Sequence, residues 1–268
     1  MPAHLLDTQR AFDSVAADYD GLSGNNALIQ RLRARTMAAV IAHVRAGGAL
    51  LDLGCGAGLD AECLARRGYR VTAIDWSPQM AQKTQTRIAH AGLSESVEVR
   101  ALGIHELDQL PTGSFAGAYS DLGPLNCVPD LNAAARLIAA ALRPGGKLIA
   151  SVIGRVCPWE LMVFGMKGQW GRARVRFARE LVPIPLNGQT VWTRYYSPRE
   201  FQSAFAAASF ELVSLRALGL LVPPPYMIAF AERHPRWIDF WRGVEDRTAG
   251  WLLLREWGDH FLIVMRRV

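Results

Sequence analysis

LLDLGCGAG at residues 50–58, followed by VTAID at residues 71–75, decides the fold of this chain. An apolar run that breaks into closely spaced glycines is typical of a buried strand that turns sharply into a helix. In such a turn the backbone N–H groups and the missing Cβ atoms let a ligand approach closely. Asp75, about twenty residues further on at the tip of the next strand, is placed to accept from two ribose hydroxyls. The two stretches predict an α/β domain that binds a nucleoside-containing cofactor.

Spacing and charge distinguish between two classes of cofactor. The dinucleotide fingerprint G-x-G-x-x-G would require a glycine at position 59, where this chain has Leu59. The chain instead has alternate glycines, Gly54, Gly56 and Gly58, with the acid Asp52 two residues before the first. An acid at that place suits a cationic ligand and would repel a pyrophosphate. A dehydrogenase of the Rossmann type is thus disfavoured, and a glycine turn without any ligand is the structural alternative.

Strands and helices alternate from this stretch onward. Ser77 and Pro78 form a good N-cap and first turn for one of the helices. Strands that alternate with helices of this length indicate right-handed crossovers and a parallel sheet. The strands are predicted at residues 49–53, 70–74, 97–101, 115–120 and 147–152, and the helices between them at residues 57–67, 78–91 and 131–142.

Both ends of the chain depart from this alternation. Helices are predicted at residues 8–20 and 27–44, and residues 154–191 are irregular in pattern and indicate an inserted cap. A capping box at Ser197 opens a further helix. After it we expect a strand at residues 210–218, a helical stretch with Trp237, Trp241 and Trp251, and a terminal strand at residues 259–265. We therefore expect one domain in four parts, namely an N-terminal helical lid (1–48), a cofactor-binding core (49–153), the inserted cap (154–196) and a C-terminal part (197–268).

The composition limits the surroundings and partners of the chain. Half of its 268 residues are hydrophobic, but the apolar run 148–166 holds charged residues and a proline and is a poor membrane span. The N-terminus has no signal-peptide pattern, and the four scattered cysteines predict reduced, buried thiols. The net charge of +6 is dense only at Arg172, Arg174, Arg176 and Arg179, which a solvated helix face explains better than a phosphate track. We expect a cytoplasmic protein that neither enters a membrane nor binds nucleic acid.

Taken together, these stretches resemble the class I S-adenosylmethionine-dependent methyltransferases. Residues 52–58 resemble motif I of that family, and DWSPQM at residues 75–80 is similar to its acid-hydrophobe-Ser-x-x-Met run. LRPGGKL at residues 142–148 matches the L-[KR]-P-G-G turn that leads into the fifth strand. FDSVAADYD at residues 12–20 resembles the N-terminal signature of the ubiquinone and menaquinone C-methyltransferase-like branch. The resemblance implies a Rossmann-like, mostly parallel sheet with an antiparallel last strand, and S-adenosyl-L-methionine as the cofactor.

The resemblance also implies which residues contact the cofactor. Tyr19 would lie over it, Asp75 would bind its ribose and Trp76 would pack on its adenine. The full set of implied cofactor-binding residues is Tyr19, Asp52, Gly54, Cys55, Gly56, Gly58, Asp75, Trp76, Met80, Gly103, Ile104, Asp121 and Leu122.

One departure from the family's pattern follows the third strand. There the family usually has Gly-Asp-Ala, whose acid reaches the adenine amino group, whereas residues 102–107 of this chain read LGIHEL. Adenine recognition would then fall to backbone groups near Gly103 and Ile104, or to His105. For His105 we expect a solvent-exposed loop position in preference to a cofactor contact.

Methyl transfer from a sulfonium is an in-line displacement, so the positioning of the reactants supplies much of the rate. A general base is needed only if the acceptor atom carries a proton that must leave. Asp121 follows the fourth strand, at the edge where open sheets bind ligands, and is the best candidate for that base. Ordering the loop or binding the methionine ammonium are its alternative roles. Tyr19 and Tyr196 are candidates for a hydrogen bond to the acceptor, or else lid or core tyrosines.

Other features bear on the acceptor. PPPY at residues 223–226 resembles a motif of amino methyltransferases that act on bases, but it does not follow the fourth strand, so we expect a rigid turn. Asp121 and Asn126 alone do not make a metal site, so no metal is expected. The tryptophans of the cap suit a small apolar or aromatic acceptor, and fit a cap core or a homodimer interface equally well.

We therefore predict an enzyme that transfers a methyl group from S-adenosyl-L-methionine to a small, apolar or aromatic organic acceptor. The alternatives are a C-methyltransferase that acts on a quinone-like ring, and a module that binds the cofactor without transferring a methyl group. A nucleic-acid methyltransferase is a third, which the basic charge favours and the segment after the fourth strand disfavours.

Overall fold

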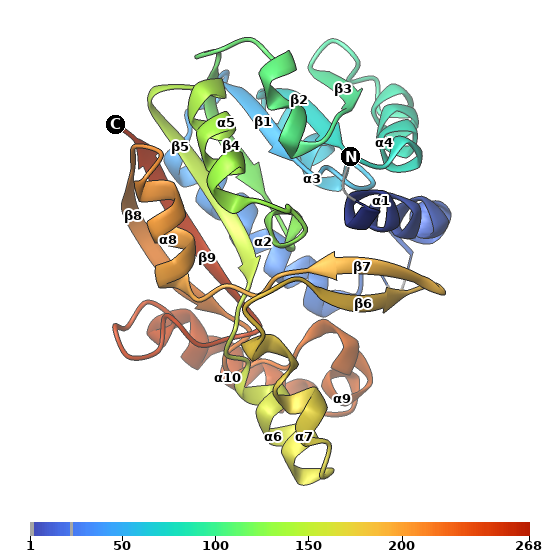
Figure 1. The fold of residues 1–268 in the computed structure, drawn as a ribbon, viewed down its shortest axis with the longest axis vertical. Helices are drawn as coiled ribbons and strands as arrows, with labels where there is room; N and C mark the ends of the chain where they lie inside the picture. The colour runs from blue at the N-terminus through green and yellow to red at the C-terminus, as the bar shows by residue number, and fades with distance from the viewer. Residues whose placement is uncertain (1–2, 22–23) are drawn as a thin grey trace.

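The computed structural model describes residues 3–21 and 24–268, and its centre is one seven-stranded sheet (Figure 1). The strands of this sheet are β1 (Ala49–Leu53), β2 (Arg70–Asp75), β3 (Val97–Ala101), β4 (Phe115–Ser120), β5 (Leu142–Ile153), β8 (Phe210–Leu218) and β9 (His260–Arg267). Their order is β3-β2-β1-β4-β5-β9-β8. The first five strands pair in parallel, whereas β9 is antiparallel to both β5 and β8. The prediction of a mostly parallel sheet with an antiparallel last strand is confirmed.

Helices cover both faces of the sheet and extend beyond one end of it (Figure 1). The α-helices are α1 (Ala3–Val15), α2 (Ala27–His43), α3 (Leu59–Ala65), α4 (Pro78–His90), α5 (Leu131–Ala141), α6 (Pro158–Met166), α7 (Trp170–Ala173), α8 (Pro198–Ala206), α9 (Ile228–Arg233) and α10 (Pro235–Thr248). Short 3-10 turns are η1 (Ala16–Asp18), η2 (Ile104–Gln109), η3 (Pro124–Asn126), η4 (Val175–Phe177) and η5 (Pro225–Met227). A separate hairpin consists of β6 (Val182–Leu186) and β7 (Gln189–Thr193). None of the helices in the described ranges is long and apolar enough to cross a membrane.

Two apolar cores lie on the two faces of the sheet. Helices α5 and α8 cover one face, where Ile138, Phe201 and Phe205 are fully buried. Helices α2 and α3 cover the other, where Val40 and Leu64 are fully buried. The sheet is therefore buried on both faces, as the apolar strand sequences predict for a parallel sheet. Because the strands are packed on both faces, the residues at their carboxyl ends are held in fixed positions, where a ligand site can form.

Most of the predicted elements are confirmed, several with the predicted bounds. The strands expected at 49–53, 97–101, 115–120 and 210–218 coincide with β1, β3, β4 and β8. The first helix instead runs from Ala3 to Val15 and continues as the 3-10 turn η1. Strand β5 begins at Leu142, earlier than predicted, and the left-handed Gly145 (φ +77°) accommodates the irregular register there. The run PPPY follows β8 and forms the 3-10 turn η5, as expected of a turn.

The cap differs from its prediction, because part of the irregular stretch 154–191 forms the hairpin β6–β7. Strand β6 contains Pro183 and Pro185, which lack the N–H that a central strand needs. A two-stranded hairpin tolerates them, since the N–H groups of an edge strand can face away from its partner. Asn187 and Gly188 form the turn with positive φ values of 48° and 74°, which is the geometry of a tight hairpin turn. The Asn-Gly pair was therefore the sequence signal for this hairpin.

Two further expectations for the cap and its neighbours were wrong. Trp251 lies beyond α10, which ends at Thr248, and 61 % of its surface is exposed. The arginine run does not form a solvated helix face throughout, because Arg176 is buried. Its guanidinium donates to both carboxylate oxygens of Glu160 and to the carboxylate of Asp259 at 2.6–2.7 Å. Arg176 thus joins α6 to the start of β9.

Candidate active site

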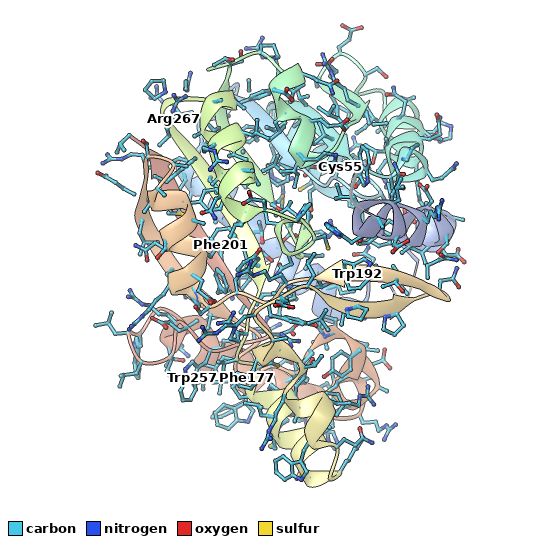
Figure 2. The ribbon with its side chains drawn as sticks, in the orientation of Figure 1. Cys55, Phe177, Trp192, Phe201, Trp257 and Arg267 are labelled. Carbon is cyan, nitrogen blue, oxygen red and sulfur yellow. The ribbon has the colours of Figure 1, made fainter. Side chains whose placement is uncertain are left out.

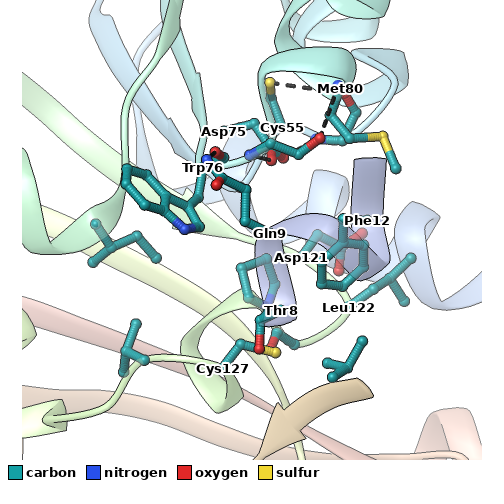
Figure 3. A pocket seen from close by; sticks show the side chains of 18 of the residues that line it. Thr8, Gln9, Phe12, Cys55, Asp75, Trp76, Met80, Asp121, Leu122 and Cys127 are labelled. Carbon is teal, nitrogen blue, oxygen red and sulfur yellow. Dashed lines mark hydrogen bonds between the residues drawn. The ribbon is translucent and has the colours of Figure 1, made fainter. Parts of the chain in front are cut away.

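A cavity of about 210 Å³ lies at the carboxyl ends of β1, β2 and β4 (Figure 3). Helix α1 and strand β7 form its opposite wall, through side chains that include Leu5, Thr8 and Val191. Figure 3 shows Asp75, Cys55 and Met80 at one end of the cavity and Thr8 and Cys127 at the other. The ligand-binding edge predicted from the strand order is therefore the place where the structure has its cavity.

The glycine loop after β1 allows two other segments to approach. Gly54 has φ +88°, and a Cβ added there would lie 2.5 Å from Cβ of Pro124, which follows β4. Gly56 has φ +53°, and a Cβ there would lie 3.1 Å from Cε1 of Tyr19. A side chain at either place would push away the segments that wall the cavity. The loop is thus shaped by close approach, as predicted from its sequence.

Asp75 at the end of β2 is held by two backbone donors. Its Oδ2 accepts from the N–H of Gly56 at 2.8 Å and its Oδ1 accepts from the N–H of Ser77 at 2.9 Å. Burial raises the pKa of Asp75 to about 6, while these two donors act in the opposite direction. Because a carboxylate offers about four lone-pair sites, acceptor capacity is left on the cavity side. The geometry suits a ligand that presents hydroxyl donors.

Asp52, the other acid of the motif, does not line the cavity. It is 2 % exposed, below the glycine loop, and its Oδ2 has no hydrogen-bond partner. Burial raises the pKa of this carboxyl well above its usual range, and the neighbouring Asp60 adds to the effect. The negative charge that the sequence assigned to Asp52 is therefore found elsewhere, on carboxylates that reach the cavity.

Three charged side chains that reach the cavity form a cluster on α2, α3 and the segment after β4. Arg33 donates to Oδ2 of Asp60 at 2.7 Å, and Thr36 donates to Oδ1 of Asp121 at 2.6 Å. Burial and the charge of Asp121 together raise the pKa of Asp60. Oδ2 of Asp121 has no partner among the described residues. Sequence analysis found Asp121 but missed Arg33 and Asp60, although an acid in the first turn after the glycine loop was a usable signal.

Charge along the whole lining favours a cation. The carboxylates of Asp60, Asp75 and Asp121 face the single guanidinium of Arg33 within the described part of the lining. A sulfonium that also carries an ammonium group fits such a site, whereas a pyrophosphate would be repelled. The residues present therefore fit S-adenosyl-L-methionine, with Asp75 at the ribose and the cluster of Arg33, Asp60 and Asp121 at the methionine end.

An aromatic pair borders the end of the cavity beyond Asp75. Trp76 and His105 contact edge to face, with ring centroids 4.6 Å apart at 75°. Trp76 donates from Nε1 to the carbonyl of Leu5, and its own carbonyl accepts from Gln9. His105 lines the cavity and is only partly exposed. The expectation of a solvent-exposed loop histidine was therefore wrong, because α1 and Trp76 cover that loop.

The two candidate tyrosines lie in different places. Tyr19 lines the cavity, and burial raises its pKa to about 12, so its phenol stays neutral and can donate or accept a hydrogen bond. Tyr196 is 2 % exposed, outside the lining, and packs edge to face on Phe201 with ring centroids 6.0 Å apart. Arg194 lies over the ring of Tyr196. The structure thus brings Tyr19 to the site and leaves Tyr196 in the core.

Some of the other predicted cofactor-binding residues line the cavity and some do not. Gly58 begins α3 and packs on Thr84, and the backbone of Gly103 is used by Glu106. Of the thirteen implied cofactor-binding residues, Asp52, Gly58 and Gly103 are outside the lining. Those that line the cavity are Tyr19, Gly54, Cys55, Gly56, Asp75, Trp76, Met80, Ile104, Asp121 and Leu122.

Apart from Asp121, the end of the cavity farther from Asp75 is lined largely by uncharged side chains. Its wall includes Phe12, Leu122, Cys127, Ile153 and Thr193. Leu122 has φ +61°, a strained value for a residue with a Cβ. This conformation occurs where the segment after β4 turns under the cavity. The wall is apolar, with the Thr193 hydroxyl and the Cys127 thiol as polar groups.

Helix α1 and the hairpin β6–β7 are joined over this end of the cavity. The Trp192 N–H donates to Oγ1 of Thr8 at 3.1 Å, and Nε1 of Trp192 donates to Asp7 at 3.1 Å. The side chain of Asn187 donates to the carbonyl of Ser14 at 3.1 Å. Figure 2 shows Trp192 on the hairpin, across from Cys55 at the end of β1. Together α1 and the hairpin, here called the roof, cover the end of the cavity farther from Asp75.

The cysteines and the acids outside the cavity have other surroundings. All four cysteines are free thiols, of which Cys55 and Cys157 are buried, whereas Cys63 and Cys127 are partly exposed. Cys157, Glu160 and Asp259 lie close enough together to hold a metal ion. Arg176 already donates to both carboxylates of that group, so its guanidinium supplies the positive charge there. The absence of a metal from the chemistry stays a prediction.

Comparison with known proteins gives the same family as the geometry. A family model described as a methyltransferase domain matches residues 50–146. The ubiquinone biosynthesis O-methyltransferase of Xanthomonas oryzae pv. oryzae (strain PXO99A) is 41 % identical over 112 residues, which are 41 % of this chain and 45 % of that protein. The match thus spans less than half the length of this curated relative.

Solved structures share the fold over nearly the whole chain. The [4+2]-cyclase SpnF has a TM-score of 0.67 at 18 % identity, covering 99 % of this chain and 97 % of its own. The 1,6-didemethyltoxoflavin-N1-methyltransferase of Burkholderia thailandensis, solved with bound 1,6-didemethyltoxoflavin and S-adenosylhomocysteine, has a TM-score of 0.60 at 20 % identity, covering 98 % of this chain and 88 % of that chain. The domain match, the strand order and the cavity agree: residues 50–146 carry a methyltransferase domain, and the fold around them is that of the class I S-adenosylmethionine-dependent methyltransferases.

Proposed function

We propose that this protein transfers the methyl group of S-adenosyl-L-methionine to a small, uncharged acceptor that is largely apolar or aromatic. The observation that carries the proposal is that one cavity has two kinds of lining. Carboxylates and the glycine loop line one part, and apolar side chains under the roof line another, with Asp121 beside the apolar Phe12 and Leu122. A cationic cofactor and a neutral acceptor would meet where the two parts join.

S-adenosyl-L-methionine supplies an electrophilic methyl group on a sulfonium. Asp75 accepts from the ribose hydroxyls, and the backbone donors of Gly56 and Ser77 fix its orientation. The carboxylates of Asp60 and Asp121 attract the positively charged methionine end. Phe12 and the ring of Tyr19 exclude water from the place of transfer, where alignment of the two reactants lowers the barrier.

The apolar part of the lining supports a ring-bearing acceptor. Leu122, Ile153 and Val191 offer surfaces to a flat apolar molecule, and the Thr193 hydroxyl offers a hydrogen bond. The name of the Xanthomonas relative, a ubiquinone biosynthesis O-methyltransferase, supports a phenolic hydroxyl as the methylated group. The alternative is C-methylation of a quinone-like ring, which the N-terminal stretch at residues 12–20 favours.

Asp121 is the group we propose as general base for such a hydroxyl. Thr36 holds its Oδ1, and its Oδ2 is without a partner at the cavity. An Asp121→Asn variant separates the two roles open to this residue. If Asp121 removes a proton, turnover falls by about a hundredfold or more while the Kd of S-adenosylhomocysteine changes little. If Asp121 only holds the methionine ammonium, the Kd rises by a comparable factor.

The direct test combines binding with transfer. Calorimetric titration with S-adenosylmethionine should show one site, and titration with a nicotinamide dinucleotide should show none. Transfer of radiolabelled methyl groups is then measured with catechols and hydroquinones, and with matched acceptors that carry a carboxylate. Label on the neutral phenols is the expected result. Tight binding of the dinucleotide alone would overturn the cofactor, and label only on charged acceptors would overturn the acceptor class.

A second candidate is a module that binds the cofactor without transferring its methyl group. It is favoured by one specific observation, namely that SpnF, a protein of this fold, is a [4+2]-cyclase. Saturable binding of S-adenosylmethionine without label on any phenol would favour this candidate.

We further propose that the chain is one domain in four parts and that the protein is cytoplasmic. We also propose that it forms a homodimer and binds no nucleic acid. Light scattering at increasing protein concentration tests the dimer. Retention on immobilised RNA that falls with salt and with free competitor would contradict the last part.

A further inference from the structure

Beyond Asp75, the part of the cavity beside Trp76 is bordered by the polar side chains of Gln9 and His105. Leu102, Ile104, Trp76 and Met80 supply apolar or aromatic surfaces, and His105 supplies an imidazole. With the ribose on Asp75, the base of the cofactor would extend into this part of the cavity, because β3 is the next strand along the sheet. Of the two polar side chains, Gln9 already donates to the Trp76 carbonyl, whereas His105 lies against Gly103 just after β3.

Backbone groups near Gly103 are already used. The Gly103 N–H donates to Oε2 of Glu106 at 3.0 Å, and its carbonyl accepts from the Glu106 N–H at 2.9 Å. The Leu102 N–H donates to the carbonyl of Asp75 at 2.9 Å. The N–H groups of Leu102 and Gly103 are therefore occupied, and the N–H groups that begin η2 can donate to the base but cannot accept from its amino group.

The ring of His105 is held beside Trp76, but its nitrogens have no hydrogen-bond partner among the described residues. Its ring packs edge to face on Trp76, which α1 holds in place through Leu5 and Gln9. A Cβ added at Gly103 would lie 2.3 Å from Cε1 of His105, so the glycine leaves room for the ring. A fixed ring with an open acceptor nitrogen is a recognition group for an N–H donor.

We propose that the imidazole of His105 accepts a hydrogen bond from the 6-amino group of the cofactor's adenine. This inference rests on the proposed function, since it assumes that the cavity binds S-adenosyl-L-methionine. His105 would then do in this chain what an acid after the third strand does in the pattern that the chain otherwise resembles. The role is one of binding specificity, and His105 takes no part in methyl transfer.

The test is a double-mutant cycle between the residue and the ligand group. The ligands are S-adenosylhomocysteine and its analogue in which hydrogen replaces the 6-amino group. The proteins are the wild type and His105→Phe, which keeps an aromatic ring against Trp76 but removes the nitrogens. The wild type should bind S-adenosylhomocysteine about fivefold more tightly than the analogue, the value of one net hydrogen bond. His105→Phe should bind the two ligands equally.

Two further variants protect the test against a folding defect. Gly103→Ala displaces the His105 ring without changing it and should also reduce the preference. His90→Phe changes an exposed histidine on α4, outside this cavity, and should keep the wild-type preference. Equal binding of both ligands by the wild type, or an unchanged preference in His105→Phe, overturns the role of His105 alone. If the wild type binds neither ligand, the proposed function fails as well.

Discussion

The two walls of the cavity are built in different ways. The cofactor wall is made from strand ends and tight turns, and its key groups, such as Asp75 and the glycine loop, are held by backbone hydrogen bonds within the sheet. The roof is made from α1 and the hairpin β6–β7, whose contacts join residues as far apart in sequence as Thr8 and Trp192. The first wall is fixed by local sequence and the second by tertiary packing. We expect changes in the two walls to separate into effects on the cofactor and effects on the acceptor.

The largest expected effect concerns neither wall but the base of the cap. Arg176→Met leaves the carboxylates of Glu160 and Asp259 buried without their guanidinium. The free energy of unfolding should fall by about 3–5 kcal/mol, as for other broken buried ion pairs. Chemical denaturation measures this change. Arg242→Gln, which removes an exposed pair with Asp239, is the matched control and should change stability by less than about 0.5 kcal/mol. Equal effects of the two variants would show that the buried network does not hold the cap.

The next effect tests the cofactor wall. Asp75→Ala removes the acceptor for the ribose hydroxyls and should raise the Kd of S-adenosylhomocysteine by about a hundredfold, since bonds to charged groups are worth about 1.5–3 kcal/mol. Calorimetry measures the change. Asp7→Ala, in the roof, removes the acceptor for Trp192 Nε1 and is the control. A Kd that rises as much in Asp7→Ala would mean that the two walls do not act separately.

A smaller effect follows from the pKa of Asp75, which burial raises to about 6. Between the unfolded value of about 3.9 and this value, the folded protein binds more protons than the unfolded chain. The contribution of Asp75 to stability therefore falls as the pH rises from about 4 to about 6, in protein without cofactor. Ribose binding needs the carboxylate, so the Kd of S-adenosylhomocysteine should rise about fivefold from pH 6 to pH 5.

Asp75→Asn provides the control for this pH dependence. The Kd of S-adenosylhomocysteine for this variant should be higher than that for the wild type at every pH. Its rise from pH 6 to pH 5 should lack the part that comes from Asp75. A pH profile identical in shape to that of the wild type would assign the titration to another group.

The smallest expected effect concerns the roof. Thr8→Val removes the acceptor of the Trp192 N–H and should speed hydrogen exchange in residues 182–193 by about threefold. The Kd of S-adenosylhomocysteine should not change. Exchange measured by mass spectrometry reports the first effect and calorimetry the second. Unchanged exchange would mean that Thr8 does not hold the hairpin to α1.

Sequence predicted the cofactor wall well because its features are local. Asp75, Trp76, Gly54 and Gly56 carry spacing that one strand-turn-helix unit imposes, and all four line the cavity, whereas Gly58 does not. The prediction failed for Asp52, because spacing does not tell whether an acid lies in a cavity or beneath a loop. It failed for His105 for the same kind of reason, since the covering α1 (Ala3–Val15) is far from it in sequence.

The roof and the charged cluster could not be predicted from local patterns. Arg33 and Asp60 meet across 27 positions of sequence, and no periodicity relates them. The hairpin β6–β7 had a signal in Asn187 and Gly188, but the prolines of β6 pointed to an irregular segment. Arg176 has the composition of a surface residue and is buried only because two distant carboxylates surround it.

Because the hairpin β6–β7 is inserted between η4 and α8 and forms a sheet of its own, its loss or exchange would leave the order of the seven-stranded sheet unchanged. A graft of a longer or differently shaped hairpin would thus change the part of the cavity under the roof, while the cofactor wall kept its geometry. Related chains could diversify their substrates by this route, and a protein engineer could alter selectivity by rebuilding about a dozen residues.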